Sequence, residues 1–270
     1  MKLAPILSAG LALVVAGCGA DIGAGGGSGD SYASSVKQAD EARKAGDFDA
    51  AMPLYGRALQ AKPDGVEAKL GLGQVYLSAG APDEAAALFR DVLEKRANDQ
   101  TARRGLAMAL ISMGQPDLAE RQLEAALLAD GRDYRTLNAY GVVLDMTGRH
   151  AEAQARYRQG IELAPDYLPL RNNFGLSLAI SGQPEEAIGQ LAPLATSRDA
   201  DGRVRQNLAL AYAMNGDLEN CLLVSRKDLS EQSAQRQLQY FMQLRSLPVE
   251  ARSAELRRNP SFFPQAGGGA

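Results

Sequence analysis

The sequence contains few of the residues that enzymes use for chemistry. Among 270 residues there is no tryptophan, a single histidine, His150, and only two cysteines, Cys18 and Cys221. One imidazole and two thiols cannot complete a Cys₂His₂ or His₃ zinc site. The sequence also shows no second histidine and no plausible pair of nucleophile and base from which a serine or cysteine hydrolase could be proposed. We therefore expect no catalytic residue, no metal site, no cofactor and no enzyme activity.

Aromatic residues are also scarce, at 6% of the chain. A core must then be built from alanine, leucine, valine and isoleucine, which favours closely packed helices over strands. The hydrophobic fraction of 46% and the charged fraction of 23% are those of a folded chain. The net charge of −3 lacks the basic excess that phosphate binding needs. We expect an all-α protein that does not bind nucleic acid.

Residues 1–17 have the pattern of a secretory signal peptide. Lys2 gives a positive start, and the apolar stretch 6–16 is shorter than the roughly 20 residues that span a bilayer. The segment ends in VAGC, at Cys18, and this ending resembles the bacterial lipobox. The resemblance implies cleavage before Cys18 and attachment of diacylglycerol and a fatty acyl chain such as palmitate. An ordinary signal peptide with an incidental cysteine is the alternative.

Residues 18–31 are expected to form a lipidated cysteine followed by a glycine-rich tether. The run lacks Gly-Lys-Ser, so it does not match a phosphate-binding loop. The residue after Cys18 is Gly19 rather than an aspartate. In the enterobacterial lipoproteins that this N-terminus resembles, a residue other than aspartate at this position favours the outer membrane over the inner one. We expect a lipid-anchored protein of the bacterial outer membrane that faces the periplasm. Acylation of Cys18 would leave Cys221 without a disulfide partner, as a small buried residue.

From residue 32 the sequence repeats every 34 residues. A glycine recurs at this spacing between two apolar stretches: Gly46, Gly80, Gly114, Gly148, Gly182 and Gly216. When each glycine is numbered 15, positions 8 and 20 hold small residues, and positions 7, 11 and 24 of the second, third and fourth units hold larger apolar ones. The period and these positions resemble the tetratricopeptide repeat (TPR), in which each unit is a helix–turn–helix.

The resemblance implies a right-handed superhelical solenoid of about six TPR repeats with a C-terminal capping helix. The expected units are 32–65, 66–99, 100–133, 134–167, 168–201 and 202–235, and the capping helix is 232–247. Unit one has Gln38 and Ala42 at apolar positions, which predicts a weak first helix. Unit six has Ser225 and Asp228 where apolar and small residues belong. Residues 248–270 are expected to be a disordered polar tail, apart from a stretch compatible with a helix at 250–258.

The first helices of a TPR array line a concave face that binds peptides. The positions facing it are 2, 5, 6, 9, 12 and 13, and they predict this peptide-binding groove: Arg104, Asn138, Asn172, Asn173, Arg203, Gln206 and Asn207. An amide has both donors and acceptors, so a row of amides can hold a peptide backbone of any sequence. Hydrogen bonds from these amides to neighbouring helix ends or water are the alternative.

Arginines also recur on the first helices, at Arg103, Arg104, Arg135, Arg171, Arg203 and Arg205. Such a row can attract an acidic segment or a C-terminal carboxylate. A solvated face with surface ion pairs is the other interpretation. The row lacks the full Lys/Asn/Lys/Arg set of the chaperone-type carboxylate clamp. His150, at position 17, follows a turn and is expected to pack.

Residues 171–247 resemble the TadD-type Flp pilus assembly lipoproteins. The segments that carry the resemblance are RNNFGLSLAISGQPEEAIGQLAPLA, RVRQNLALAYAMNGD and LQYFMQLRSL. The resemblance implies an outer-membrane scaffold that assists assembly of the Flp/Tad pilus and secretion machinery, with the Tad secretin or other pilus components as partners. The alternative is a general envelope TPR scaffold that serves outer-membrane protein insertion, a type IV pilus pilotin function or peptidoglycan enzymes.

Overall fold

The structure is a computed structural model that describes residues 27–197 and 201–259. These residues form fourteen helices and no strand. The helices are α1 (Gly27–Lys44), α2 (Phe48–Ala61), α3 (Val66–Ser78), α4 (Pro82–Lys95), α5 (Gln100–Ser112), α6 (Pro116–Ala129), α7 (Tyr134–Met146), α8 (His150–Leu163), α9 (Leu168–Ile180), α10 (Pro184–Ala195), α11 (Gly202–Asn215), α12 (Leu218–Ser225), α13 (Glu231–Ser246) and α14 (Val249–Arg257). The predicted signal peptide 1–17 and Cys18 lie outside the described residues.

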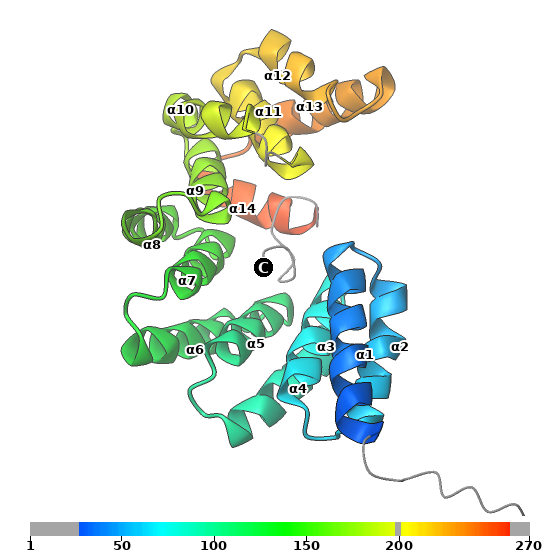
Figure 1. Cartoon of the computed structure of the whole chain (residues 1–270). Coiled ribbons are helices and arrows are strands. Elements are labelled where there is room, and N and C mark those ends of the chain that lie inside the picture. The colour runs from blue at the N-terminus through cyan, green and yellow to red at the C-terminus, as the bar shows by residue number, and fades with distance from the viewer. Residues whose placement is uncertain (1–26, 198–200, 260–270) are drawn as a thin grey trace, which may run out of the picture.

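Helices α1–α12 form six pairs that stack into a curved solenoid, as the repeat predicts (Figure 1). Each helix packs against the next one along the chain. The first helices, α1, α3, α5, α7, α9 and α11, also pack against one another in succession, whereas within the described chain the second helices of successive pairs do not. The first helices are therefore closer together and form the inner, concave face. The second helices form the outer face.

The turn inside each pair depends on glycine. All six repeat glycines have φ between 72° and 89°, a left-handed conformation that costs a residue with a Cβ about 1–2 kcal/mol. At Gly114, as at Gly46, Gly80 and Gly148, no other heavy atom lies within 4 Å of an added Cβ. Backbone conformation rather than space therefore requires glycine at these turns.

Other small residues allow the two helices of a pair to approach. A Cβ on Gly141, at position 8 of the fourth unit, would lie 2.3 Å from Cε1 of Tyr157 on α8. The Tyr157 ring is fully buried in the space that this glycine leaves. Ala153, at position 20, is fully buried as well. Small residues on both helices thus make room for one large side chain between them.

The N-terminal end differs from the sequence prediction in where its first helix begins. Helix α1 begins at Gly27, inside the predicted tether 18–31, and runs for 18 residues. Gln38 is exposed, but Tyr32 and Val36 pack against the first buried cluster and Ala39 is fully buried in it. These contacts hold the helix, and extending a helix that is already anchored costs little.

At the C-terminal end, α13 (Glu231–Ser246) agrees with the predicted capping helix 232–247 to within one residue. Helix α12 has only 8 residues and ends at Ser225, so the second helix of unit six is shorter than the repeat predicts. The Ser225 hydroxyl bonds the carbonyl of Cys221 at 2.9 Å and Oε1 of Gln237 on α13 at 2.6 Å. A polar residue at this apolar position therefore ends the pair and joins it to the cap. Residues 249–257 of the predicted tail form α14, which packs on α7, α9 and α13.

Two glycine-to-alanine substitutions should have opposite effects. Gly114→Ala should lower the free energy of unfolding by about 1–2 kcal/mol, because φ is positive there. Gly189→Ala should raise it by about 0.5–1 kcal/mol, because Gly189 lies inside α10 with open space around it. Urea denaturation followed by circular dichroism measures both values. Equal effects of the two substitutions would show that the turn conformation does not constrain residue 114.

Candidate functional site: the inner face of the solenoid

The inner face changes character halfway along the stack. We compare positions 9 and 13 of each unit, which the repeat places on this face. In the first three units they are occupied by Asp40, Lys44, Gln74, Ser78, Met108 and Ser112, none of which is buried. In the last three they are occupied by Val142, Met146, Leu176, Ile180, Leu210 and Met214, all of which are buried except the half-buried Met146. We call these two sets of positions the open half and the covered half.

The chain's own C-terminal helices pack on the covered half. Helix α13 packs against α11 and α12, and α14 then turns back across α9 and α7. Figure 1 shows α14 on the inner side of the curve, beside these two helices. Leu256 on α14 is fully buried in the same apolar cluster as Leu176 and Ile180 of α9. Part of the inner face is therefore already occupied by a helix.

The predicted amides form an ordered ladder within the inner face. Nδ2 of Asn173 donates to Oδ1 of Asn138 at 2.9 Å, and Nδ2 of Asn207 donates to Oδ1 of Asn172 at 3.0 Å. In both pairs, position 6 of one unit bonds position 5 of the unit before it. Asn172, Asn173 and Asn207 are 9%, 6% and 3% exposed. The ladder therefore joins α7 to α9 and α9 to α11, and Asn138 is its more accessible member.

Arg104 takes the ladder position in the third unit, where it forms an ion pair. Its Nη1 lies 2.6 Å from Oδ2 of Asp133, and its Nη2 donates to the hydroxyl of Thr101 at 3.1 Å. Burial lowers the pKa of Arg104, and Asp133 opposes that shift. The ion pair of this guanidinium with Asp133 links α5 to the loop before α7.

Other inner cations are more accessible. Arg135 is exposed in the first turn of α7, and its guanidinium carbon lies 4.7 Å from the ring centre of Tyr134 and 5.7 Å from that of Tyr167. Arg203 is exposed in the first turn of α11, and Arg171 is half-buried between them on α9. Gln206, the remaining predicted groove residue, is half-buried in α11. Arg135 and Arg203 are the predicted cations best placed to meet a partner.

A buried polar cluster lies where α7, α8, α9 and α14 meet, and sequence reasoning missed most of it. Oδ1 of Asp145 lies 2.7 Å from Nδ1 of His150 and accepts a hydrogen bond from Ser177 at 2.7 Å, while its Oδ2 accepts one from Tyr157 at 2.9 Å. Nε2 of His150 lies 3.1 Å from Oγ of Ser253 on α14. Burial raises the pKa of Asp145, although these hydrogen bonds oppose the shift.

Ser253, His150 and Asp145 are hydrogen-bonded in the order of a serine-hydrolase triad. Ser253 is 1% exposed, however, so its hydroxyl does not face a substrate. No group of three histidine, cysteine, aspartate or glutamate side chains in the described part of the chain could hold a metal ion. His150 is 7% exposed and packs, as position 17 predicts. The sequence signal for this cluster was an acidic residue, Asp145, within the apolar run VVLDM.

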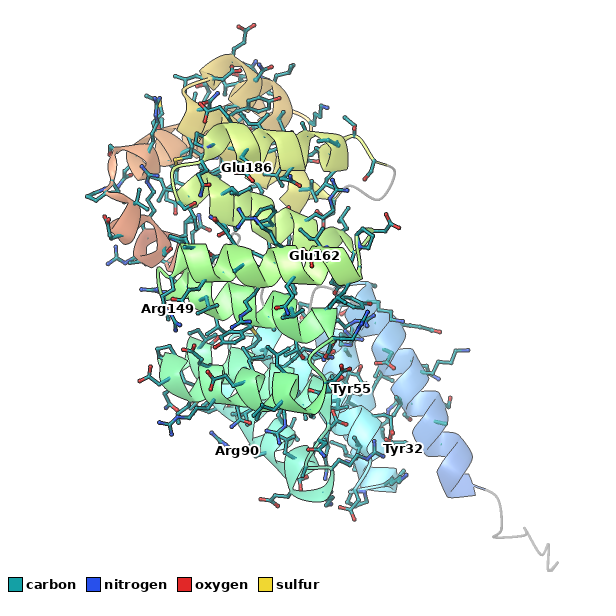
Figure 2. The ribbon with its side chains drawn as sticks, turned by 90° about the vertical axis from the view of Figure 1, so that its left-hand side faces the viewer. Tyr32, Tyr55, Arg90, Arg149, Glu162 and Glu186 are labelled. Carbon is teal, nitrogen blue, oxygen red and sulfur yellow. The ribbon has the colours of Figure 1, made fainter. Side chains whose placement is uncertain are left out.

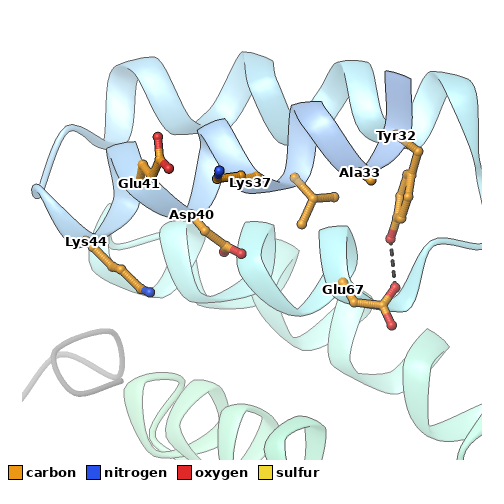
Figure 3. A pocket seen from close by; sticks show the side chains of 8 residues that line it. Tyr32, Ala33, Lys37, Asp40, Glu41, Lys44 and Glu67 are labelled. Atoms are coloured by element: carbon orange, nitrogen blue, oxygen red, sulfur yellow. Dashed lines mark hydrogen bonds between the residues drawn. The ribbon is translucent and has the colours of Figure 1, made fainter. Parts of the chain in front are cut away.

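The open half contains a hollow beside α1 (Figure 3). It measures about 450 Å³, and eight residues line it: Tyr32, Ala33, Val36, Lys37, Asp40, Glu41, Lys44 and Glu67. The Tyr32 hydroxyl donates to Oε2 of Glu67 at 2.9 Å and so joins α1 to α3. The hollow is lined by both acidic and basic side chains, so it has no dominant charge.

The outer face is covered by charged side chains that link neighbouring units (Figure 2). Arg149 lies 2.7 Å from Glu120 of the preceding unit and 2.6 Å from Glu152. Arg158 lies 4.0 Å from Glu186 of the next unit. These exposed pairs stabilise the stack only modestly.

A further prediction concerns the burial of Cys221. Cys221 is fully buried, and burial raises the pKa of its thiol to about 11. It is therefore an inert core residue rather than a reactive thiol. None of the described helices is long and apolar enough to cross a bilayer.

Comparisons with known proteins agree with this architecture. Three tetratricopeptide-repeat family models match residues 36–100, 76–139 and 134–159. A stretch of 64 residues, 24% of the chain, is 42% identical to the uncharacterized protein y4yS of Sinorhizobium fredii and spans 35% of that protein. A second stretch of 92 residues, 34% of the chain, is 33% identical to the TPR repeat-containing thioredoxin TTL4 of Arabidopsis thaliana and spans 14% of it. The chain thus matches about a third or less of each relative.

Solved structures share the fold at low identity. The thermophilic TPR protein TTC0263 of Thermus thermophilus superposes with a TM-score of 0.63 at 21% identity, over 67% of this chain and 98% of that one. PilW, described as a widely conserved type IV pilus biogenesis factor, superposes with a TM-score of 0.62 at 16% identity, over 78% of this chain and 98% of its own. At these identities the likeness concerns the fold alone.

The amide ladder predicts strong coupling between Asn172 and Asn207. Asn207→Ala should lower the free energy of unfolding by about 1–3 kcal/mol, because it leaves the buried Oδ1 of Asn172 without its donor. The double variant Asn172→Ala, Asn207→Ala should cost less than the sum of the two single variants. Chemical denaturation of the four proteins of this cycle measures the coupling.

Arg203→Ala is the matched control, because Arg203 is exposed on the same helix as Asn207. It should change the free energy of unfolding by less than about 0.5 kcal/mol. Strictly additive effects of the two asparagine substitutions would show that the ladder does not join α9 to α11.

Proposed function

We propose that this chain, a tetratricopeptide-repeat protein, is a scaffold whose inner face holds a segment of a partner protein. The observation that carries the proposal is the continuous succession of first helices from α1 to α11 along one side of the stack. TPR proteins are generally scaffolds rather than enzymes, and the family models that match this chain are all repeat models. A curved stack of this kind offers an extended concave surface for binding.

The chemistry of the inner face suggests how a segment is held. Arg135 and Arg203 are exposed in the first turns of α7 and α11, where a carboxylate or acidic side chain can pair with them. Gln74 and Met108 extend the face into the open half, where no described helix covers it. We therefore propose that a partner segment lies along the open half and extends past Arg135 on α7 to Arg203 on α11.

We further propose that the protein acts in assembly of the Flp/Tad pilus and secretion machinery, through the secretin or another pilus component. The support is the resemblance of residues 171–247 to the TadD-type lipoproteins. PilW, which shares the fold, is described as a type IV pilus biogenesis factor. A general envelope scaffold is the rival, and neighbouring genes for pilin, secretin and secretion ATPase would favour the pilus role.

The lipobox supports a lipid anchor at Cys18, and Gly19 after it supports a periplasm-facing position at the outer membrane. Several acyl chains at one site hold a protein stably on a membrane. A tethered scaffold raises the local concentration of its partner and so favours assembly there.

The first prediction from this function concerns the arginines. The double variant Arg135→Glu, Arg203→Glu should reduce recovery of the secretin, or of another crosslinked partner, at least tenfold in a pull-down from intact cells. Each substitution replaces an attractive charge by a repulsive one on the inner face. Quantitative mass spectrometry of the recovered proteins measures the change.

The matched control reverses two exposed arginines on the second helices, Arg90→Glu and Arg121→Glu. This variant has the same net charge, and its recovery should equal that of the native chain. Loss of partners from the outer-face variant, with none from the inner-face one, would contradict the proposed site.

The second prediction concerns the anchor. Cys18→Ser should move the protein from the membrane fraction to the soluble periplasmic fraction, because serine cannot form the thioether to diacylglycerol. Metabolic labelling with a fatty-acid analogue should mark the native chain and not the variant. Substitution Cys221→Ser serves as the control and should leave both labelling and fractionation unchanged. A Cys18→Ser protein that stays labelled and membrane-bound would refute the lipoprotein assignment.

A further inference from the structure

We infer that the surface beneath α14 is a helix-binding site, and that an amphipathic helix of the partner protein replaces α14 there. The inference deepens the proposed function, on which it rests for the existence of a partner. The open half and the covered half have the same repeat register, yet only the covered half is apolar and buried. The sequence thus builds half of the inner face for an apolar occupant. In this structure α13 packs on its α11 part and α14 on its α7 and α9 part.

The contacts of α14 define what such an occupant must offer. Leu256 enters the apolar cluster and is fully buried. One turn earlier, Ser253 bonds His150 at 3.1 Å, and Nη1 of Arg252 donates to the carbonyl of Ile180, the last residue of α9, at 3.1 Å. That carbonyl belongs to a helix end, where no further turn of α9 supplies a donor. The site therefore fits a helix that has arginine at position i, a small hydroxyl residue at i+1 and leucine at i+4.

Helix α14 buries fewer large apolar side chains than a repeat helix does. Among its nine residues only Val249 and Leu256 are large and apolar, and Val249 is only half-buried. Helix α9, in contrast, buries most of its length. Helix α14 is also the last described helix, joined to α13 by the link Leu247-Pro248, so its departure breaks no connection between repeat helices. A partner helix with more apolar residues at the same positions would compete with it.

Amide hydrogen exchange on the unaltered full chain is the primary test. The amides of α14 should exchange at least 100-fold faster than those of α9, because α14 opens while the solenoid stays folded. If the amides of α14 exchange only as slowly as those of α9, then α14 leaves only on global unfolding, and the inference is wrong.

Peptide binding to full-chain variants is the second test. The probe is a fluorescein-labelled peptide of residues 247–259, and the readout is fluorescence polarisation. Leu256→Asp in the chain places a charge at a fully buried site and should release α14. The variant should keep its helical circular dichroism and bind the probe at least tenfold more tightly than the native chain does. The control Arg257→Asp, at an exposed position of the same helix, should bind like the native chain.

A probe that itself carries Leu256→Asp should not bind the released chain. Equal binding of the probe to the native chain and the folded Leu256→Asp variant would overturn the inference, as would a dimer formed by exchange of α14 between two copies. The two proposals fail separately. If the inner-face arginines are needed for partner capture but α14 never opens, the proposed function stands. If the released surface binds the probe but no partner is captured, only the helix-binding site stands.

Discussion

Every part of this structure depends on the fact that one helix pair cannot bury its own apolar face. Small residues such as Gly141 and Ala153 bring the two helices of a pair together, but the larger side chains are covered only when the next pair stacks on them. The same need explains the ends of the stack. Helix α1 closes one end with Tyr32 and Val36, and α13 closes the other with Leu238 and Phe241. The inner face is a consequence of this stacking.

Hydrogen bonds and an ion pair within the chain order the polar side chains of the inner face. The two amide pairs connect α7 to α9 and α9 to α11, and the pair of Arg104 with Asp133 connects α5 to the loop before α7. The cluster around Asp145 connects three repeat helices to α14. Because these groups already have partners inside the chain, the partner segment that we propose would meet other side chains of the inner face. Asparagines at groove positions therefore contribute here to the shape of the face that a partner would meet.

Much of the fold could be predicted from the sequence, because its determinants are local and periodic. The glycines at 34-residue spacing mark the six left-handed turns, and position 8 marks the close approach of the helices. The ends were predicted less well. Three features depend on contacts between segments far apart in sequence, such as Ser253 with His150: the length of α1, the shortness of α12 and the packing of α14 on the inner face. No local sequence pattern predicts such contacts. The roles of Asn172 and Asn207 likewise depended on their being paired with each other, which spacing alone left open.

The central claim is that a partner binds the inner face of the stack. Site-specific photo-crosslinking in intact cells tests it most directly, with the crosslinking residue placed at Gln74 on the inner face or at Arg90 on the outer face. Our account predicts a discrete crosslinked adduct from position 74 and none from position 90. An adduct from position 90 alone would contradict it.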